Sequence, residues 1–308
     1  MKGMELAKGY YETYGRPMIH EKFPGFEQRI AVGLVGEGSE CFGYDDEYSK
    51  DHDFGPAFCM WLPAEVMEQI GERLQEEYSR LPLWYGGLKA RRDNRIGGHR
   101  TGVWEIWDFY RHFLMIHGVP KTMMEWMRLP ESYLAVAVNG EVFRDDEGRF
   151  SEIRQYLLNG YPEDVRIKKM VARAAVMSQS GQYNYPRCRK RGEPVAAELA
   201  LAEFIKSGIS MIYLLNRRYA PFYKWMHRGL RELDLLEDTW NLFQDLTDPM
   251  VTEKEKQETV ELICEKIVKE LKKQHLVETE EPFLQSHLDT MMQKIEDPQI
   301  RKLHWLQG

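Results

Sequence analysis

The chain has 308 residues, of which 43% are hydrophobic and 30% charged, and its formal net charge is -7. That length and composition allow a sizeable core and favour two domains over one. No apolar run approaches the roughly 18 residues that span a bilayer, and the N-terminal residues lack a hydrophobic signal core, so we expect a cytoplasmic protein without membrane contact. Four cysteines lie far apart with no CxxC pair, which argues against a zinc ribbon and a disulfide framework.

The charge is unevenly distributed along the chain. The negative total argues against long nucleic acid as a partner. Between Gly181 and Arg231, however, ten Lys and Arg residues stand against three Glu residues. A basic segment on an acidic protein indicates a small anionic ligand better than a long polyanion. The alternative is a set of solvated helix faces with ion pairs four residues apart.

The first 119 residues mix strand and helix patterns. A short helix ends at Pro24-Gly25, a buried strand covers 29–36, and a tight turn over Gly36–Ser39 opens a short helix. Further strands are predicted where compact apolar runs occur, over 58–62 and 102–107, and helices where the apolar period is 3.6 residues, over 63–81 and 108–116.

From Pro120 onwards strand patterns nearly vanish. Helical periodicity covers 121–129, 151–158, 162–178, 193–218, 223–236, 254–273 and 282–295. We therefore predict an α+β fold with two domains: a small mixed-sheet domain over 1–119 and an all-helical domain over 120–308.

The residues with the most chemical information lie in 32–54. A strand leads to Gly38-Ser39, and eleven residues later Asp51-His52-Asp53 precedes an apolar run. In a strand, Asp51 and Asp53 project to the same face, and paired carboxylates of this kind suit a divalent cation such as magnesium. A Gly-Ser turn at a helix start offers main-chain N–H groups to a phosphate. One short segment thus combines a candidate phosphate site with a candidate metal site.

This arrangement resembles the nucleotidyltransferase superfamily that includes DNA polymerase beta. The matching residues are Gly38, Ser39, Asp51 and Asp53. The superfamily has a third carboxylate on a neighbouring strand. Glu105, between Trp104 and Ile106, fits that description best because its surroundings have a strand pattern. Glu141 stays open as the alternative, although Gly140 before it indicates the end of a helix.

More narrowly, the chain resembles a bacterial group known as domain of unknown function 4037, which brings no assigned substrate. The similarity rests on VGLVGEGSECFGYDDEYSKDHDFGP, NGEVFRD and LLNRRYAPFYKW and reaches to about Leu236. Two positions depart from the wider superfamily pattern. Glu37 stands where an apolar residue precedes the glycine, and His52 stands where an aliphatic residue separates the two acids.

The resemblance implies a metal-dependent nucleotidyltransferase that transfers a nucleoside monophosphate from a nucleoside triphosphate to a hydroxyl acceptor, with release of pyrophosphate. It implies two magnesium ions, bridged by Asp51 and Asp53 and joined by Glu105. The helical domain would cover the nucleotide and shape a pocket for a small-molecule acceptor. Basic side chains there would contact the triphosphate, and the candidates are Arg191, Arg218 and Lys224.

Two other hypotheses remain open at this stage. The same chemistry can act on a protein side chain or an RNA 3′ end. Alternatively, the protein is an inactive relative that binds a nucleotide or a protein partner without catalysis.

Overall fold

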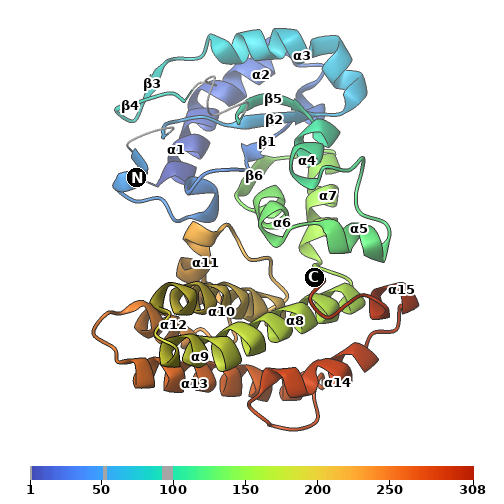
Figure 1. Cartoon of the computed structure of the whole chain (residues 1–308). Helices are drawn as coiled ribbons and strands as arrows, with labels where there is room; N and C mark the ends of the chain where they lie inside the picture. The colour runs from blue at the N-terminus through green and yellow to red at the C-terminus, as the bar shows by residue number, and fades with distance from the viewer. Residues whose placement is uncertain (1, 51–53, 92–99) are drawn as a thin grey trace. The chain divides into compact units, whose positions relative to one another are not determined.

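The computed structural model describes residues 2–50, 54–91 and 100–308 (Figure 1). The chain forms two compact units: unit 1 comprises Met1–Val119 and Tyr133–Asn159, and unit 2 comprises Pro120–Ser132 and Gly160–Gly308. The combination of a small mixed sheet with many helices confirms the predicted α+β class. The division into domains at 119/120 stays a prediction; in the structure, residues 133–159 group with the first 119.

Unit 1 contains the β-strands and the helices around them. The four strands of its main sheet are β1 (Ala31–Leu34), β2 (Cys59–Leu62), β5 (Gly102–Glu105) and β6 (Glu141–Arg144), and a small hairpin pairs β3 (Trp84–Tyr85) with β4 (Leu88–Lys89). Its helices are α1 (Gly3–Tyr10), α2 (Arg16–Lys22), α3 (Ala64–Ser79), α4 (Ile106–Leu114) and α7 (Arg149–Leu158). Shorter segments are η1 (Tyr11–Gly15), η2 (Glu27–Arg29), η3 (Glu40–Phe42) and η4 (Tyr48–Lys50).

The main sheet has the strand order β5-β2-β1-β6. Strand β1 is antiparallel to both β2 and β6, and β2 is parallel to β5. The strands predicted over 29–36, 58–62 and 102–107 are confirmed, although each is shorter than expected. Strand β6 was not predicted. Its four residues come directly after the helix end that Gly140 indicates, and they become a strand only by pairing with β1.

Alternation along β2 explains how both faces of the sheet are covered. Met60 and Leu62 join a core that also contains Tyr11 and Ile19, so this face packs against the N-terminal helices and α3. Trp61 points to the other face, where its ring stacks on Phe150 at a centroid distance of 3.9 Å. The sheet is therefore buried on both sides.

Unit 2 is helical in its described residues. Its longer helices are α8 (Glu163–Met177), α10 (Pro194–Leu215), α12 (Thr239–Thr247) and α13 (Glu253–Lys273), and its shorter ones are α5 (Met123–Arg128), α9 (Tyr185–Lys190), α11 (Tyr223–Gly229), α14 (Leu288–Gln293) and α15 (Pro298–Arg301). A π-helical segment of seven residues is η5 (Ser178–Asn184), and two short 3-10 segments are η6 (Leu230–Glu232) and η7 (Leu284–His287). Helix α6 (Glu131–Val138) begins in unit 2 and continues into unit 1.

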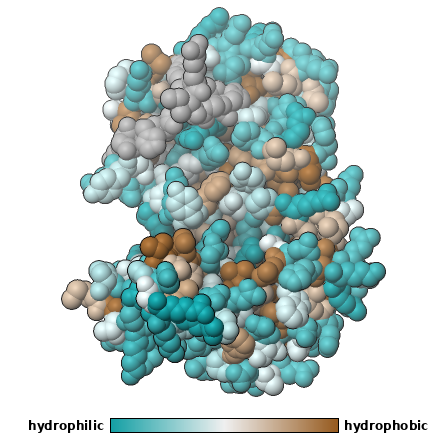
Figure 2. Space-filling model, viewed as in Figure 1, coloured by the Kyte–Doolittle hydropathy of each residue, from teal (hydrophilic) through white to brown (hydrophobic). Residues whose placement is uncertain are grey.

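Apolar side chains are buried inside each unit, and the surface reflects this. Hydrophilic residues dominate the face of each unit that Figure 2 shows, with apolar residues scattered among them. None of the helices in the described ranges is both long and apolar enough to cross a bilayer.

Helix α8 buries two lysines in the interior of unit 2. The Lys168 ammonium donates to the main-chain oxygen of Trp305 at 3.1 Å and to that of Gln307. The Lys169 ammonium donates to two other carbonyl oxygens and lies 4.9 Å from the centroid of the Tyr161 ring. Burial is the main cause that lowers the pKa of each lysine to about 8, and the nearby Arg173 charge adds to it.

These lowered pKa values predict that unit 2 becomes more stable as the solution becomes alkaline. An unfolded lysine keeps its proton up to a pKa of 10.5. Between pH 8 and 10.5 the unfolded chain therefore binds more protons than the folded one, and the free energy of unfolding rises with pH, by up to about 1.4 kcal/mol per pH unit for each lysine. Urea unfolding at pH 7.5, 8.5 and 9.5 should show a smaller rise in Lys168→Met than in the parent. Equal slopes would contradict the prediction.

Candidate functional site

The glycine-rich turn after β1 is anchored by an asparagine from far along the chain. The Asn139 side chain accepts a hydrogen bond from the Gly36 N–H at 2.9 Å and donates to the Gly36 oxygen at 2.8 Å. Gly36 and Gly38 have φ values of 126° and 134°, a region that residues with a side chain avoid. The predicted turn therefore has one defined conformation, fixed to the start of β6.

The turn presents main-chain donors that the protein does not use. In the described part of the chain, the N–H groups of Glu37, Gly38 and Ser39 donate to no acceptor. Successive free N–H groups in such a turn form a concave site for an anion. The short helix predicted to follow is a single 3-10 turn, η3, so the donors come from the turn itself.

A buried ion pair lies against this turn. The carboxylate oxygens of Glu40 approach Gly38 so closely that a Cβ atom there would lie 2.6 Å from them. The same carboxylate pairs with the Arg91 guanidinium at 2.5 Å, and both side chains are buried. Because Arg91 neutralises Glu40, the carboxylate does not add a net negative charge beside the unused donors.

The neighbouring Cys41 has no features of a nucleophile. Its side chain is buried, and burial raises the pKa of the thiol well above its ordinary value, with the Glu40 charge acting in the same direction. A thiol that keeps its proton is a poor nucleophile.

The predicted acids Asp51 and Asp53, with His52 between them, lie outside the described residues. They belong to the connection that leaves the sheet after Leu34 and returns to it at Cys59. Because β1 and β2 are antiparallel and Gly33 pairs with Cys59, both ends of this connection meet the same end of the sheet. The free N–H groups of the turn lie in that connection too.

The register of the sheet separates the two candidates for the third carboxylate. Glu105 pairs with Leu62 in β2, at the end of the sheet opposite to the turn. Its Oε2 atom accepts a hydrogen bond from the Asp108 N–H at 2.9 Å and caps α4. Glu141 pairs with Leu34 in β1, at the same end of the sheet as the turn.

Glu141 is also accessible there. Its side chain is 44% exposed and forms an ion pair with Lys8 of α1. Gly140 before it has a φ of 64°, and a Cβ atom there would lie 2.0 Å from the Leu34 oxygen. Only glycine therefore allows the chain to leave α6 and start β6 at this point.

A metal site cannot be built from the described residues alone. Within 2–50, 54–91 and 100–308, no three His, Cys, Asp or Glu side chains are grouped so that they could hold a metal ion. Glu141 is a hard oxygen donor at the right end of the sheet, as a magnesium ligand requires. The remaining ligands would have to come from Asp51 and Asp53.

The three predicted basic contacts of unit 2 are all exposed, and the structure keeps Arg191 apart from Arg218. Arg191 caps the C-terminal end of α9. Arg218 follows α10 and donates to the main-chain oxygen of Glu232 at 3.0 Å. The 22 residues of α10 lie between them, a length of about 33 Å that no triphosphate spans. Lys224 lies on α11, with its ammonium 5.3 Å from the centroid of the Trp225 ring.

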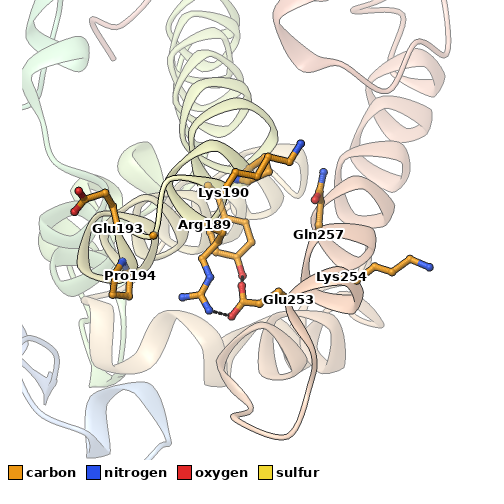
Figure 3. A pocket seen from close by; sticks show the side chains of 10 residues that line it. Arg189, Lys190, Glu193, Pro194, Glu253, Lys254 and Gln257 are labelled. Carbon is orange, nitrogen blue, oxygen red and sulfur yellow. Dashed lines mark hydrogen bonds and ion pairs between the residues drawn. The ribbon is translucent and has the colours of Figure 1, made fainter.

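Two basic residues of α9, Arg189 and Lys190, line a cavity of about 680 Å³ in unit 2 (Figure 3). Arg189 forms an ion pair with Glu253 of α13, and the Tyr185 hydroxyl donates to the same carboxylate at 2.8 Å. Figure 3 shows the Arg189 side chain directed at Glu253. Arg189 is therefore held in an ion pair between two helices, and not in the pairing four residues apart that its helical sequence suggests.

Two residues of the unit 1 site were missed in the sequence. Asn139 belongs to the NGEVFRD segment, which carries part of the family resemblance. Its role could not be predicted from that segment, because it depends on a contact with Gly36, 103 residues away. Arg91 had no local signal, because only folding brings it to Glu40.

One protein-family model matches part of the chain. Residues 126–226 match the model of the family described as Domain of unknown function (DUF4037). This match confirms the resemblance to the DUF4037 family. The DUF4037 segment contains Asn139, Gly140 and Glu141 and begins after the Gly36–Ser39 turn and the two acids.

Comparisons with individual proteins add little to the DUF4037 match. No curated protein matches the chain. A solved structure described as a nucleotidyltransferase-like protein from Exiguobacterium sibiricum 255-15 aligns with 94% of this chain and 81% of its own, at 11% identity and a TM-score of 0.38. A TM-score of this size carries no argument about the chemistry of this chain.

Proposed function

We propose that this protein is a nucleotidyltransferase that transfers a nucleoside monophosphate from a nucleoside triphosphate to a hydroxyl group of a small molecule. The observation that supports it is the connection between β1 and β2. Its ends meet one end of the sheet, it contains the unused N–H donors of Glu37, Gly38 and Ser39, and its sequence includes Asp51 and Asp53.

In the proposed reaction the acceptor oxygen forms a bond to the α-phosphorus. The bond from the α-phosphorus to the oxygen that bridges it to the β-phosphorus breaks, pyrophosphate leaves, and water takes the hydroxyl proton. The turn would bind phosphate oxygens through its N–H groups, which costs no reorganisation because Asn139 already holds the turn.

The carboxylates would position the reacting groups through a divalent cation. Asp51 and Asp53 are the proposed ligands, and we propose Glu141 in place of Glu105 as the third, because Glu141 shares the end of the sheet with the turn. Magnesium, when bound, would neutralise the triphosphate and favour loss of the acceptor proton.

A small acceptor agrees with the charge of the protein. The net charge of -7 disfavours a long RNA, because its phosphates carry charge of the same sign. Arg191 and Arg218 are too far apart to bind one triphosphate together, so at most one of them would contact it.

The test is the melting temperature with each of the four ribonucleoside triphosphates, with and without magnesium. A ligand at about 100 times its dissociation constant stabilises the folded state by about 2.7 kcal/mol, a shift that is easily measured. We expect a magnesium-dependent rise with at least one triphosphate and its loss in Asp51→Ala. No rise with any triphosphate would refute the proposal and favour a relative that binds a protein partner.

A further inference from the structure

Arg154 of α7 is a partly buried cation without a carboxylate partner. Its Nη2 atom donates to the main-chain oxygens of Asn139 and Gly140, both at the long distance of 3.3 Å. Its Nε atom is buried and has no acceptor among the residues that the structure describes. Across the described ranges no Asp or Glu side chain pairs with this guanidinium.

Neighbouring arginines in unit 1, unlike Arg154, form ion pairs with carboxylates. Arg144 pairs with Glu27 at 2.6 Å and also with Asp146. Arg149, five residues before Arg154 on α7, pairs with Glu65 at 2.9 Å and with a second carboxylate at 3.0 Å.

The lack of a counter-ion affects the titration of Arg154. Burial lowers the pKa of its guanidinium below the ordinary value, and no carboxylate acts against that effect. Taking a charge out of water without a counter-ion costs free energy, and this partly buried arginine therefore destabilises the folded state. An anion at the guanidinium would remove that cost.

The position of Arg154 indicates which anion fits. Its two carbonyl acceptors belong to Asn139 and Gly140. The Asn139 side chain holds the Gly36 backbone, and the Gly140 N–H donates to the Cys41 oxygen at 2.8 Å. Arg154 is thus fixed to the same strand end as the turn with its free N–H groups. A guanidinium near a row of main-chain donors suits an anion with several oxygens, such as a polyphosphate.

We propose that Arg154 and the Gly36–Ser39 turn form a binding site for a polyphosphate chain. The identification of that chain as the triphosphate of the substrate rests on the proposed function, whereas the binding of the anion does not. A purely structural role for Arg154 would be to cap the C-terminal end of α6, and the two carbonyl contacts support that role.

The experiment measures binding of inorganic tripolyphosphate by calorimetry, without magnesium and at fixed ionic strength. The full chain is compared with Arg154→Met and with Arg149→Met, which removes the same charge from the same helix. We expect Arg154→Met to weaken binding at least 10-fold, Arg154→Lys to restore part of it, and Arg149→Met to stay within 2-fold of the parent.

Thermal melting without ligand separates the binding role from the capping role. If Arg154 serves an anion, Arg154→Met melts at the parent temperature or above it, because an uncompensated charge has been removed. A lower melting temperature together with unchanged tripolyphosphate binding would overturn the proposal, and so would a parent protein that does not bind tripolyphosphate. Binding that depends on Arg154 in a protein that transfers no nucleotide would refute the proposed function alone.

Discussion

Asp53→Asn is expected to lower the rate of nucleotide transfer by about 10³-fold or more while leaving the melting temperature without ligand unchanged. The proposed cation stabilises the charge of the transition state by several kcal/mol, and loss of a ligand removes a large part of that effect. Asparagine keeps the size of the side chain, so the fold should tolerate it. Pyrophosphate release with a labelled triphosphate and a panel of hydroxyl acceptors measures the rate.

A matched control for this variant lies in the same connection between β1 and β2. Glu47 is exposed, and Glu47→Gln removes one negative charge from the connection, as Asp53→Asn does. We expect Glu47→Gln to keep the parent rate. Parent activity in Asp53→Asn would show that the acid pair is not the site of transfer.

Glu131→Gln should be among the most destabilising single changes in unit 2. Glu131 is buried and pairs with Arg173 at 2.7 Å, and the Ser210 hydroxyl lies 3.0 Å from each carboxylate oxygen. Its charge also acts on Lys169, whose pKa it raises against the larger, opposite effect of burial. Removing one partner of a buried ion pair costs about 3–5 kcal/mol, which corresponds to a fall in melting temperature of about 6–20 °C.

Two further variants test whether the loss of stability in Glu131→Gln comes from the buried ion pair. Glu203→Gln on α10 removes an exposed carboxylate and should change the free energy of unfolding by about 0.5 kcal/mol at most. The double variant Glu131→Gln/Arg173→Met should recover part of the loss, because it removes the cation that lost its partner. A fall of less than about 1 kcal/mol in Glu131→Gln would contradict the role assigned to the ion pair.

The elements that the sequence predicted correctly are those whose signal is local. The run of 29–36 is apolar and bounded by glycines, so a buried strand and a turn follow from neighbouring residues alone. Helix α3 has its apolar residues on one face and Pro63 at its start, which is sufficient to predict its position. Gly140 indicated the end of a helix because few other residues accept a positive φ.

Residues whose roles depend on pairing between distant segments were predicted less well. Glu105 comes after an apolar run and Glu141 after Asn139-Gly140, a turn-like pair. Only the register of β5 and β6 shows which end of the sheet each glutamate occupies. Strand β6 exists because it pairs with β1, more than 100 residues earlier. A strand of four residues has too short a pattern to predict such a partner.

The sequence by itself determined the class of fold, the turn at Gly36–Ser39 and the acid pair as candidates, because backbone preference and side-chain chemistry belong to single residues and their neighbours. Only the tertiary structure decided that Asn139 holds the turn, that α10 separates Arg191 from Arg218, and that Arg154 pairs with carbonyl oxygens and with no carboxylate of the described residues. These properties are distances between remote segments. They arise when hydrogen bonds and buried contacts form across the chain, and no local pattern specifies them.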